Sequence, residues 1–552
     1  MFLLIKSTSI YLFQIQPMHF KDFRYNFETH KLGIPMKYLM AIDAGTGSVR
    51  AVIFDTQGNQ ISVGQREWMH LEEPDVPNSM SFDCETNWGL VCECIKEALH
   101  VSNISSDDIL ALSATSMREG IVLYDKEGKE LWGVANVDAR ADKEVKYLKE
   151  NFEGIEEEFY QLSGQTFALG ALPRILWLKN NRPEIYEKVA KVSMIGDWIL
   201  ARLSGVIATD PSNGGTTGIF SLKNRDWVSS MASKVGIKDD IFPPTLEVGT
   251  LMGSVTCKDS GLSSKTKVVM GGGDVQLGSA GLGVVAEGQV AILGGSFWQQ
   301  VVNIPSSTLP PKDMGIRVNP HVVEGLSQAE GITFFSGLVM RWFRDAFCDM
   351  EKLEAKKSGV DTYALLEEKA KEVPVGSYGI MPIFSDSMKY GKWYHASPSF
   401  LNLSLDPSTC NKYSMFKSLQ ENACIVSAIN LKKVEEFTGM KFSEIVFAGG
   451  ASKGALWSQT LADVTGCVIK IPKITEATAL GAVMAAGVGV GIYKDFVSAV
   501  GALVQWEKSY EPNMQNHKLY NEIQQNWQKA YEIQLFLVDK NITTSMWKAP
   551  GL

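Results

Sequence analysis

The chain has 552 residues, of which 45% are hydrophobic and 21% are charged, so it can form two or more sizeable cores and has an ordinary globular composition. The formal net charge of −9 argues against wholesale binding to nucleic acid or to an anionic membrane. The eight cysteines form no CxxC pair and the seven histidines show no metal-ligand spacing, so we expect reduced thiols in a cytoplasmic protein.

Residues 1–36 differ in character from the rest of the chain. The segment from Met1 to Ile15 is mostly apolar with one basic residue, Lys6, but it lacks the basic start and the small-residue cleavage site of a signal peptide. It is also too short and too polar to span a bilayer. We expect a poorly ordered N-terminal extension, with the working protein beginning near Met36; a membrane-surface anchor is the alternative.

A strand, a tight glycine turn and a second strand open the organised chain. Residues 38–42 and 49–55 are apolar runs typical of buried strands, and residues 43–48 (DAGTGS) form the turn between them. The turn fits neither of the usual nucleotide-loop patterns, but a turn rich in N–H groups and hydroxyls can still hold a phosphate. Asp43 at its mouth could hold a Mg²⁺-bound water. The alternative is an ordinary hairpin turn, which the short pattern by itself favours.

A buried strand over residues 109–114 leads to a second polar site. Arg118 and Glu119 follow the strand end, immediately before a glycine. Both side chains could hydrogen-bond the hydroxyls of a small polyol, and a surface ion pair is an equal alternative. Residues 136–140 (NVDAR) form another polar cluster, where the chain enters a helix.

Three further segments of the first half have clear patterns. Residues 87–100 and most of residues 143–205 show the apolar spacing of helices. Residues 210–218 are too rich in Gly, Ser and Thr to be core. A binding or lid loop is the functional interpretation of that segment, and a plain linker is the alternative.

Residues 266–281 combine a strand, a glycine turn and a carboxylate. The strand-like run 266–270 leads into Gly271-Gly272-Gly273, and three glycines let the backbone adopt conformations closed to other residues. Asp274 follows, and the small residues 278–281 indicate a helix packed closely on a neighbour. A carboxylate fixed on a glycine turn at a strand end suits a general base in a cleft. The alternative is that Asp274 merely caps the next helix.

The strand and glycine-turn pattern recurs later in the chain. Residues 289–302 again read as strand, turn and strand, with Gly294-Gly295-Ser296 at the turn. Residues 445–454 form a strand that ends in glycines and opens a helix, where backbone N–H groups favour an anion or a purine. Two copies of one unit about half a chain apart suggest a duplicated architecture with a cleft between the halves. The boundary should fall near Gly288.

Helical spacing dominates the rest of the second half. The predicted helices cover residues 331–347, 363–373, 412–437, 456–464, 476–487 and 515–537. The helix over 476–487 consists of small residues and must therefore pack very closely on a neighbour. Residues 375–410 read as a long irregular region, and residues 539–552 show no clear structure.

Eight motifs follow one another along the chain: DAGTGS, MREG, NVDAR, DPSN, GGGD, GGS, AGGASKG and EATALGA. This ordered set, spread over about residues 38–510, resembles the FGGY carbohydrate kinases, an α/β family with the duplicated actin-like ATPase (ribonuclease H-like) fold and two domains around a central cleft. The resemblance implies four segments. They are an extension over residues 1–36, an N-terminal kinase domain with the substrate and the base over 37–287, a C-terminal nucleotide-binding kinase domain over 288–510, and a C-terminal helix and tail over 511–552.

The resemblance also implies roles for individual residues. Asp274 would be the catalytic base, and Asp43 would bind a metal ion through water. The residues that would bind the phosphoryl acceptor, which is the alcohol substrate, are Arg118, Glu119, Asp274 and Gln276. The residues that would hold ATP are Gly45, Thr46, Gly47, Ser48, Gly294, Gly295, Ser296, Gly449, Gly450, Ala451, Ser452 and Gly454. The chain departs from the family in the second phosphate turn, which usually contains Thr, and at Pro173-Arg174, where Lys is usual.

Longer stretches resemble one branch of the family most. They are MREGIVLY, GGGDVQLG, GSFWQQVVN, MRWFRDAFC, MPIFSD and TTSMWKAPGL. That branch uses ATP and Mg²⁺ to phosphorylate the quorum-sensing signal autoinducer-2, in its linear dihydroxypentanedione form, on the terminal hydroxyl. Some relatives are regulated by a sugar-transport phosphocarrier. The residues by themselves leave open a pentulose kinase of the xylulose or ribulose type, and a non-catalytic ATP-binding switch protein. The presence of Asp274 together with Asp43 argues against the second.

Overall fold

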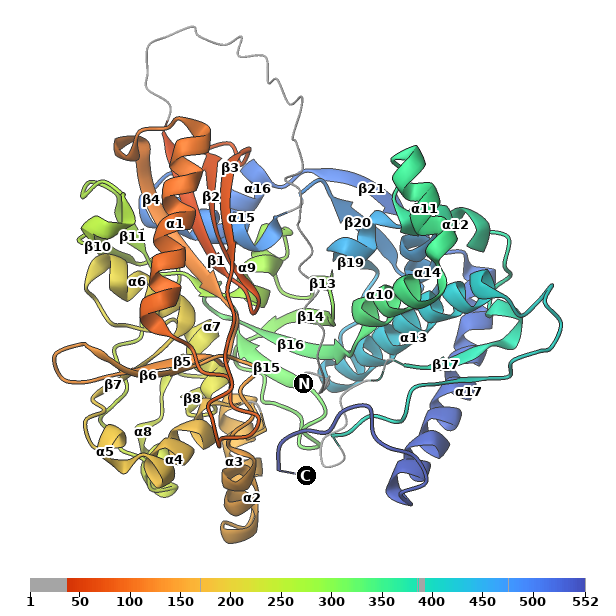
Figure 1. Ribbon diagram of the computed structural model, residues 1–552, viewed down its shortest axis with the longest axis horizontal. Coiled ribbons are helices and arrows are strands. Elements are labelled where there is room, and N and C mark those ends of the chain that lie inside the picture. Colours follow the sequence, from red (N-terminus) through yellow and green to blue (C-terminus); the bar gives the residue numbers. More distant parts are fainter. Residues whose placement is uncertain (1–36, 169, 385, 387–392, 475, 552) are drawn as a thin grey trace, which may run out of the picture.

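The computed structural model describes residues 37–551 except 169, 385, 387–392 and 475 (Figure 1). The expectation of a poorly ordered extension over residues 1–36 therefore lies outside the described residues. Among the helices that are described, none is both long and apolar enough to cross a bilayer.

The first half of the molecule is built on a seven-stranded sheet. Its order is β10-β11-β4-β1-β2-β3, with β12 also paired to β4. The strands are β1 (Tyr38–Ala44), β2 (Ser48–Asp55), β3 (Gln60–Glu67), β4 (Ile109–Ser116), β10 (Leu251–Ser254), β11 (Lys267–Val269) and β12 (Gly272–Gly273). β1 is antiparallel to β2 and parallel to β4, so the predicted strand, turn and strand over residues 38–55 are confirmed.

The second half is built on another seven-stranded sheet, of order β15-β16-β14-β13-β19-β20-β21. The strands are β13 (Val290–Gly294), β14 (Trp298–Pro305), β15 (Arg317–Pro320), β16 (Leu326–Thr333), β19 (Glu444–Ala448), β20 (Val468–Pro472) and β21 (Trp506–Tyr510). β13 is antiparallel to β14 and parallel to β19, as β1 is to β2 and β4. The two sheets therefore share a core topology, which is the duplication that the repeated motifs predict.

Strand β1 is apolar throughout because both of its faces are buried. Met40 and Ile42 pack in the cluster that contains Trp88 of α1 (Cys84–Ser102), whereas Leu39 and Ala41 pack on the opposite side with residues of α15 (Ala477–Gly489). Full burial of a side chain such as Leu39, Met40 or Ile42 contributes about 1.5–3 kcal/mol of hydrophobic stabilisation. Residues from late in the chain thus complete the core of the first half.

Helices cover the rest of the first half. They are α2 (Asp142–Asn151), α3 (Ile155–Ser163), α4 (Ala171–Asn181), α5 (Pro183–Tyr186), α6 (Ile195–Ser204), α7 (Pro211–Gly214), α8 (Ser229–Lys234) and α9 (Asp274–Gly281). The prediction of helix through residues 143–205 misses one strand, β7 (Lys191–Met194). It pairs with β5 (Ile121–Tyr124), which also pairs with β6 (Glu130–Val134). A two-residue ladder joins β8 (Phe220–Ser221) to β9 (Asp226–Trp227).

The remaining helices belong to the second half of the sequence. They are α10 (Ser336–Phe347), α11 (Asp349–Ser358), α12 (Thr362–Ala370), α13 (Lys412–Thr438), α14 (Ala455–Thr465), α15, α16 (Phe496–Leu503) and α17 (Met514–Asp539). The helix predicted over 331–347 begins only at Ser336, because residues 326–333 form β16. Within the irregular region 375–410, the described residues include a short ladder, β17 (Met381–Ile383) with β18 (Ser399–Leu401).

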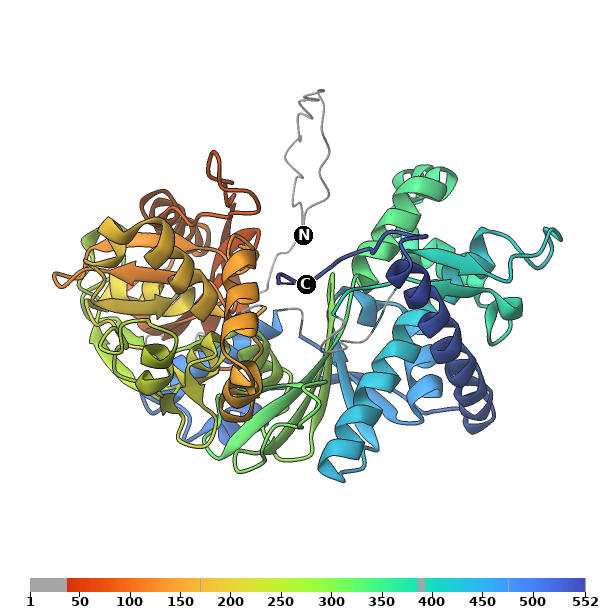
Figure 2. The same ribbon diagram turned by 90° about the horizontal axis from the view of Figure 1, so that it is seen from below.

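Helices α9 and α15 join the halves through an unusually close contact. A Cβ atom at Gly281 would lie 1.9 Å from the carbonyl oxygen of Ala477, and one at Gly481 would lie 1.9 Å from that of Leu277. Only glycine fits at either position, which confirms the predicted close packing of the small-residue helix. The two halves lie on either side of the green strands, which include β15 and β16 (Figure 2).

Candidate active site

Three parallel strand ends of the first sheet place predicted site residues together. The last residues of β1 and β12 both lie opposite Ser116, the last residue of β4. Ligands of open α/β sheets bind outside the carboxyl ends of the strands. The first glycine turn (residues 45–48), Arg118 and Asp274 all follow these ends and so lie along one edge.

Asp274 is the first residue of α9. Its Oδ1 accepts a hydrogen bond from the backbone N–H of Val275 at 2.8 Å and lies 3.7 Å from Nε of Arg118. Burial raises the pKa of the Asp274 carboxyl to about 7; Arg118 opposes this rise, whereas Asp43 and Glu119 add to it. The side chain keeps 36% of its surface exposed, so protein surrounds the carboxyl while one side stays open to solvent. Such a group can accept a proton near neutral pH.

The glycines before Asp274 serve close packing. The prediction that they adopt backbone conformations closed to other residues is wrong, because none of Gly271, Gly272 and Gly273 has a positive φ. A Cβ at Gly271 would instead lie 1.7 Å from the carbonyl oxygen of Ala114. The N-cap of α9 is Gly273, so Asp274 lies inside the first turn of the helix, where its side chain accepts a hydrogen bond from the next N–H.

The polar segment 210–218 lies beneath this turn and is buried throughout, which corrects the expectation that it is not core. Ser212 Oγ accepts a hydrogen bond from the backbone N–H of Gly273 at 2.8 Å. Asp210 in turn accepts from the backbone N–H groups of Ser212 and Asn213. Polar groups can be buried when they are hydrogen-bonded in this way. The segment is therefore a support for the Asp274 turn, and neither a lid nor a linker.

Arg118 and Glu119 lie beside Asp274 and form buried ion pairs with the second half. Arg118 donates to both carboxylate oxygens of Glu330, at 2.6 and 2.9 Å, and Arg317 donates to Glu119 at 2.6 Å. All four residues are at most 9% exposed, so the surface ion pair weighed from the sequence is wrong. Sequence reasoning missed Glu330 and Arg317. The one available signal was a charged residue at each position within an otherwise buried strand.

The first glycine turn is partly exposed and is tied to a neighbouring segment. Trp68 Nε1 donates to the carbonyl oxygen of Gly45, and Nε2 of His70 is hydrogen-bonded to that of Thr46, both at 2.9 Å. These bonds occupy carbonyl groups of the turn and fix its orientation relative to the end of β1.

The second and third glycine turns lie side by side at the edge of the second sheet. β13 and β19 are parallel with Leu293 opposite Ala448, so Gly294, the last residue of β13, and Gly449, which follows β19, lie at neighbouring strand ends. At Gly449, where φ is 102°, a Cβ would lie 2.6 Å from the carbonyl oxygen of Gly294. Of the predicted nucleotide residues here, the exposed ones are Gly295, Ser296, Gly449 and Gly450, the half-buried ones are Ser452 and Gly454, and the buried ones are Gly294 and Ala451.

Of the residues predicted to bind the alcohol substrate, Gln276 is the most buried. Its side chain is fully buried, and neither amide atom has a hydrogen-bond partner among the described residues. A Cβ on Gly273 would lie 2.7 Å from its Oε1 and 3.3 Å from Cγ of Arg118. The amide thus lies against the same turn as the stem of Arg118, and an acceptor could reach it only if neighbouring groups moved.

Comparison with known proteins identifies this arrangement. The model of the FGGY family of carbohydrate kinases matches with its N-terminal domain at residues 38–281 and with its C-terminal domain at residues 308–490. The chain belongs to the FGGY carbohydrate kinases. It is therefore a transferase that takes its phosphoryl group from ATP, as the motifs predicted.

Individual relatives agree with this family. The chain is 57% identical to the autoinducer-2 kinase of Yersinia enterocolitica over 519 residues, which cover 93% of this chain and 98% of the relative. It is 56% identical to the autoinducer-2 kinase of Klebsiella pneumoniae over 521 residues, which cover 94% and 98%.

Solved structures of other kinases have the same fold. Xylulose kinase from Lactobacillus acidophilus superposes with a TM-score of 0.79 at 20% identity, covering 91% of this chain and 99% of that one. Plasmodium falciparum glycerol kinase with ADP superposes with a TM-score of 0.79 at 19% identity, covering 91% and 98%. These likenesses bear on the fold alone, and they confirm the duplicated actin-like ATPase fold.

The acids at the first sheet edge fit a hydrated magnesium ion, the usual partner of ATP. Asp43 is buried and adds to the raised pKa of Asp274, so two acids lie near each other beside the first glycine turn. Arg50 pairs with both Asp43 and Glu476 and offsets part of this charge. The described residues contain no cluster of three or more His, Cys, Asp or Glu able to hold a metal. Because Mg²⁺ keeps several waters and uses one or two carboxylates plus phosphates, this donor set suits it.

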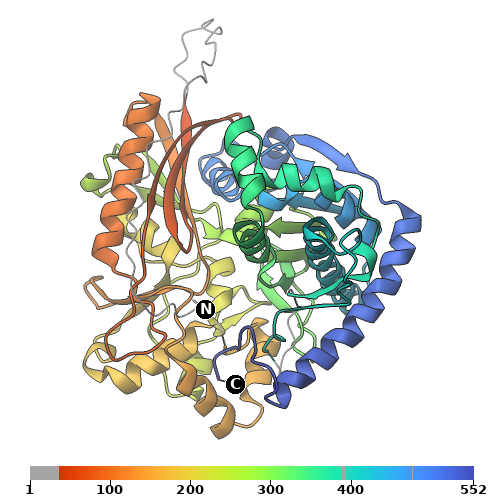
Figure 3. The same ribbon diagram turned by 45° about the vertical axis from the view of Figure 1, so that its right-hand side comes forward.

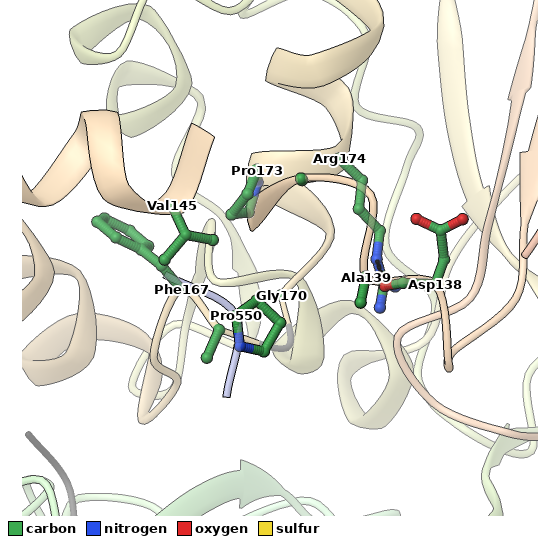
Figure 4. Close-up of a pocket in the computed structure, with 10 residues that line it drawn as sticks. Asp138, Ala139, Val145, Phe167, Gly170, Pro173, Arg174 and Pro550 are labelled. Atoms are coloured by element: carbon green, nitrogen blue, oxygen red, sulfur yellow. Dashed lines mark hydrogen bonds between the residues drawn. The ribbon is translucent and has the colours of Figure 1, made fainter. Parts of the chain in front are cut away.

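A small pocket is lined by Arg174, Asp138 and Pro550, which lies near the C-terminus (Figure 4). Arg174 donates to the backbone carbonyls of Glu119, Asn136 and Asp138. A guanidinium has five donors in a fixed plane and can make all three contacts, which an ammonium could not match in geometry. Arg174, where the chain departs from the family, therefore ties the Arg118–Glu119 segment to residues 136–138.

Proposed function

We propose that this kinase phosphorylates autoinducer-2, in its linear dihydroxypentanedione form, on the terminal hydroxyl. The observation that carries the proposal is the 57% identity, over 93% of the chain, to a relative of that activity. A pentulose kinase shares the fold, but the likeness to xylulose kinase is only 20% identical. Fold likeness at that level does not indicate the substrate.

In this proposal Asp274 is the general base. Its carboxyl, with a pKa raised to about 7, accepts the proton of the terminal hydroxyl as that oxygen attacks the γ-phosphorus of ATP. The new O–P bond forms while the bond from the γ-phosphorus to the bridging oxygen of ADP breaks. Arg118 and Glu119, beside Asp274, bind the acceptor through its oxygens.

The nucleotide is assigned to the glycine turns of both halves. Residues 45–48 and 294–296 would contact the phosphates, and residues 449–452 and 454 would contact adenine and ribose. Asp43 would hold Mg²⁺ through water, and the ion, when bound, neutralises phosphate charge. Support for facing turns comes from Arg50, which bridges Asp43 to Glu476 at the start of α15. Closing the halves would exclude water from the transferred group.

The proposal also includes a location and a regulator. All eight cysteines are free thiols, which suits the cytoplasm, where ATP is available and thiols stay reduced. A sugar-transport phosphocarrier is the regulatory partner that the family resemblance implies. Inhibition of the purified kinase by such a phosphocarrier would test that partner directly.

A product assay tests the proposed substrate. The purified chain is supplied with ATP, Mg²⁺ and, separately, autoinducer-2, xylulose, ribulose and glycerol, and ADP and phosphorylated product are measured. We expect kcat/KM for autoinducer-2 to exceed that for each other acceptor by at least about tenfold. A higher value for a pentulose would make the chain a pentulose kinase. No ADP with any acceptor would favour the ATP-binding switch.

A further inference from the structure

The β15–β16 pair of the second sheet reaches the acceptor edge of the first half. Glu330 on β16 holds Arg118 through two hydrogen bonds, and Arg317 on β15 holds Glu119 through one. The paired positions are 212 and 198 residues apart in the chain. The two residues assigned to the acceptor are therefore each held by an opposite charge from the other half.

Two amide side chains close these pairs into a ring. Gln165 accepts from Arg317 and donates to Asn319 at 2.8 Å, and Asn319 donates to Glu330 at 3.3 Å. Since Arg118 and Glu119 are neighbours in sequence, the circuit is complete. The junction ring consists of Arg118, Glu119, Gln165, Arg317, Asn319 and Glu330, and every member is at most 9% exposed.

The ring determines which nitrogen of Arg118 lies next to Asp274. The two terminal nitrogens of the Arg118 guanidinium are bonded to Glu330, and its Nε is the nitrogen 3.7 Å from the Asp274 carboxylate. A bidentate pair holds the planar fork in one orientation, which a single contact would not do. Arg118 therefore presents one defined edge beside Asp274.

The ring also keeps Arg118 from acting as an anion site. A buried guanidinium without a carboxylate partner attracts phosphate or sulfate strongly. Beside a phosphoryl-transfer site, such a guanidinium would bind phosphate oxygens, and these would displace the uncharged alcohol substrate from it. The Glu330 carboxylate neutralises the positive charge of Arg118, and the Arg317 guanidinium neutralises the negative charge of Glu119.

We propose that Glu330 and Arg317 are positioning residues of the kinase reaction: from the second half they complete the acceptor site by orienting and neutralising Arg118 and Glu119. The proposal rests on the acceptor lying beside Asp274, as in the proposed function, but not on which acceptor it is. Substrate affinity and the contact between the halves are then coupled through one set of hydrogen bonds.

The test uses Glu330→Gln, which keeps the volume of the side chain and removes its charge. We expect KM for the acceptor to rise about tenfold to a hundredfold, the effect of losing a charge-assisted hydrogen bond. KM for ATP should change less than about twofold, because the nucleotide is assigned to the glycine turns. Inorganic phosphate should inhibit the variant more strongly than the wild type, in competition with the acceptor.

A matched pair in the same region provides the control. Arg225 donates to both oxygens of Glu247, at 2.7 and 2.6 Å, and to backbone carbonyls of His321 and Leu326, which flank the β15–β16 turn. Glu247→Gln removes a carboxylate charge that supports the same β15–β16 segment but lies outside the junction ring. We expect it to lower the melting temperature while leaving the acceptor KM and phosphate inhibition unchanged. Equal effects of both variants on the acceptor KM would overturn the proposal.

A second variant serves if Glu330→Gln does not fold. Arg317→Lys keeps the charge but loses the fork that joins Glu119 to Gln165, and a smaller rise in acceptor KM is expected. The acceptor is whichever compound of the panel the wild type phosphorylates, so a pentulose result overturns the proposed substrate and leaves this test intact. An active wild type with unchanged acceptor KM in both variants overturns only the present proposal. A wild type that neither turns over nor gains thermal stability with any acceptor overturns both.

Discussion

Two buried acids beside Arg118 illustrate how residue environment separates roles. Burial raises the pKa of both carboxyls, but at Glu330 the charge and hydrogen bonds of Arg118, together with Arg317, outweigh it and hold the pKa below its usual value. At Asp274 burial prevails, because Arg118 contacts it only through a 3.7 Å separation. One acid thus stays an anion that holds a cation, and the other can exchange a proton near neutral pH.

The first prediction concerns Asp274→Asn, which keeps the shape of the side chain and removes its ability to accept a proton. We expect kcat to fall by about 10²–10⁴-fold, the usual contribution of a general base. Nucleotide affinity should barely change. The melting temperature should also hold, because only one hydrogen bond, from Val275, must be kept. A soluble Asp274→Asn protein that turns over at the wild-type rate would remove Asp274 from the mechanism.

The raised pKa of Asp274 leads to a pH prediction. The base is active when ionised, so kcat/KM for the acceptor should fall about tenfold per pH unit below about pH 7. Arg118, Asp43 and Glu119 are the charges that act on this carboxyl. For stability the sign is opposite: because the folded state favours the protonated acid, its ionisation costs stability as pH rises through about 7.

The pH profile is checked against Asp274→Asn, which should lose the acid limb and show residual activity that is flat across it. Its melting temperature above pH 7 should equal or exceed that of the wild type. An acid limb that persists in the variant would assign the titration to another group.

At the scale of elements, the sequence pattern predicts the strands whose burial follows from their own apolar residues, but not the elements whose polar residues are buried by distant partners. The apolar runs over residues 38–42 and 49–55 became β1 and β2 because strands buried on both faces need no alternation. The predicted helix start at residue 331 is too early because residues 326–333 form β16, whose polar residues, including Gln328 and Glu330, are buried by distant partners. The segment 210–218 was misjudged for the same reason, since its polar groups bond to one another and to the Asp274 turn.

The candidate site divides in the same way. Asp274 and Arg118 could be proposed from the sequence because each follows a strand end, and strand ends are visible locally. Arg317 and Glu330 could not, because their partners are 198 and 212 residues away and no local spacing relates them.

The α9–α15 contact gives an element-scale prediction. Gly481→Ala should lower the melting temperature, by an overpacking cost of about 1–3 kcal/mol or more, because the new Cβ meets the carbonyl of Leu277. It should also reduce kcat, since α9 carries Asp274. The control is Gly89→Ala in α1, where a Cβ meets nothing within 4 Å and should stabilise by about 0.5–1 kcal/mol. Thermal unfolding and turnover of both variants measure this, and unchanged behaviour of Gly481→Ala would contradict the close contact.

At the scale of the molecule, the contacts that hold the two halves together include the following three. Helix α15 packs on β1 and on α9. The junction ring links β15 and β16 to Arg118 and Glu119. The C-terminal tail crosses from the second half to the first. The first two lie in the interior. The third returns from the end of α17, which runs along the outside of the second half (Figure 3).

The tail is attached at both ends of its crossing. In the second half, Trp547 stacks on Phe334 with ring centroids 5.5 Å apart, and its carbonyl accepts a hydrogen bond from the backbone N–H of His395 at 3.0 Å. In the first half, the Gly551 N–H donates to Asp142 of α2 at 2.7 Å, and Pro550 lies in the pocket beside Phe167 (Figure 4). The tail thus limits how far the halves can separate.

The last prediction is that truncation after Thr544 uncouples the kinase. With the crossing removed, the halves should open more freely, so water reaches the transferred phosphoryl group more often. We expect ATP hydrolysis without acceptor to increase relative to acceptor-dependent turnover, and the melting temperature to fall through the loss of Trp547. Truncation after Pro550 is the matched control, because it removes the Gly551 hydrogen bond to Asp142, leaves Trp547 in place and should give a smaller change in the same direction. If the longer truncation lowers the melting temperature but leaves the ratio of hydrolysis to transfer unchanged, the tail stabilises the second half and does not restrain the cleft.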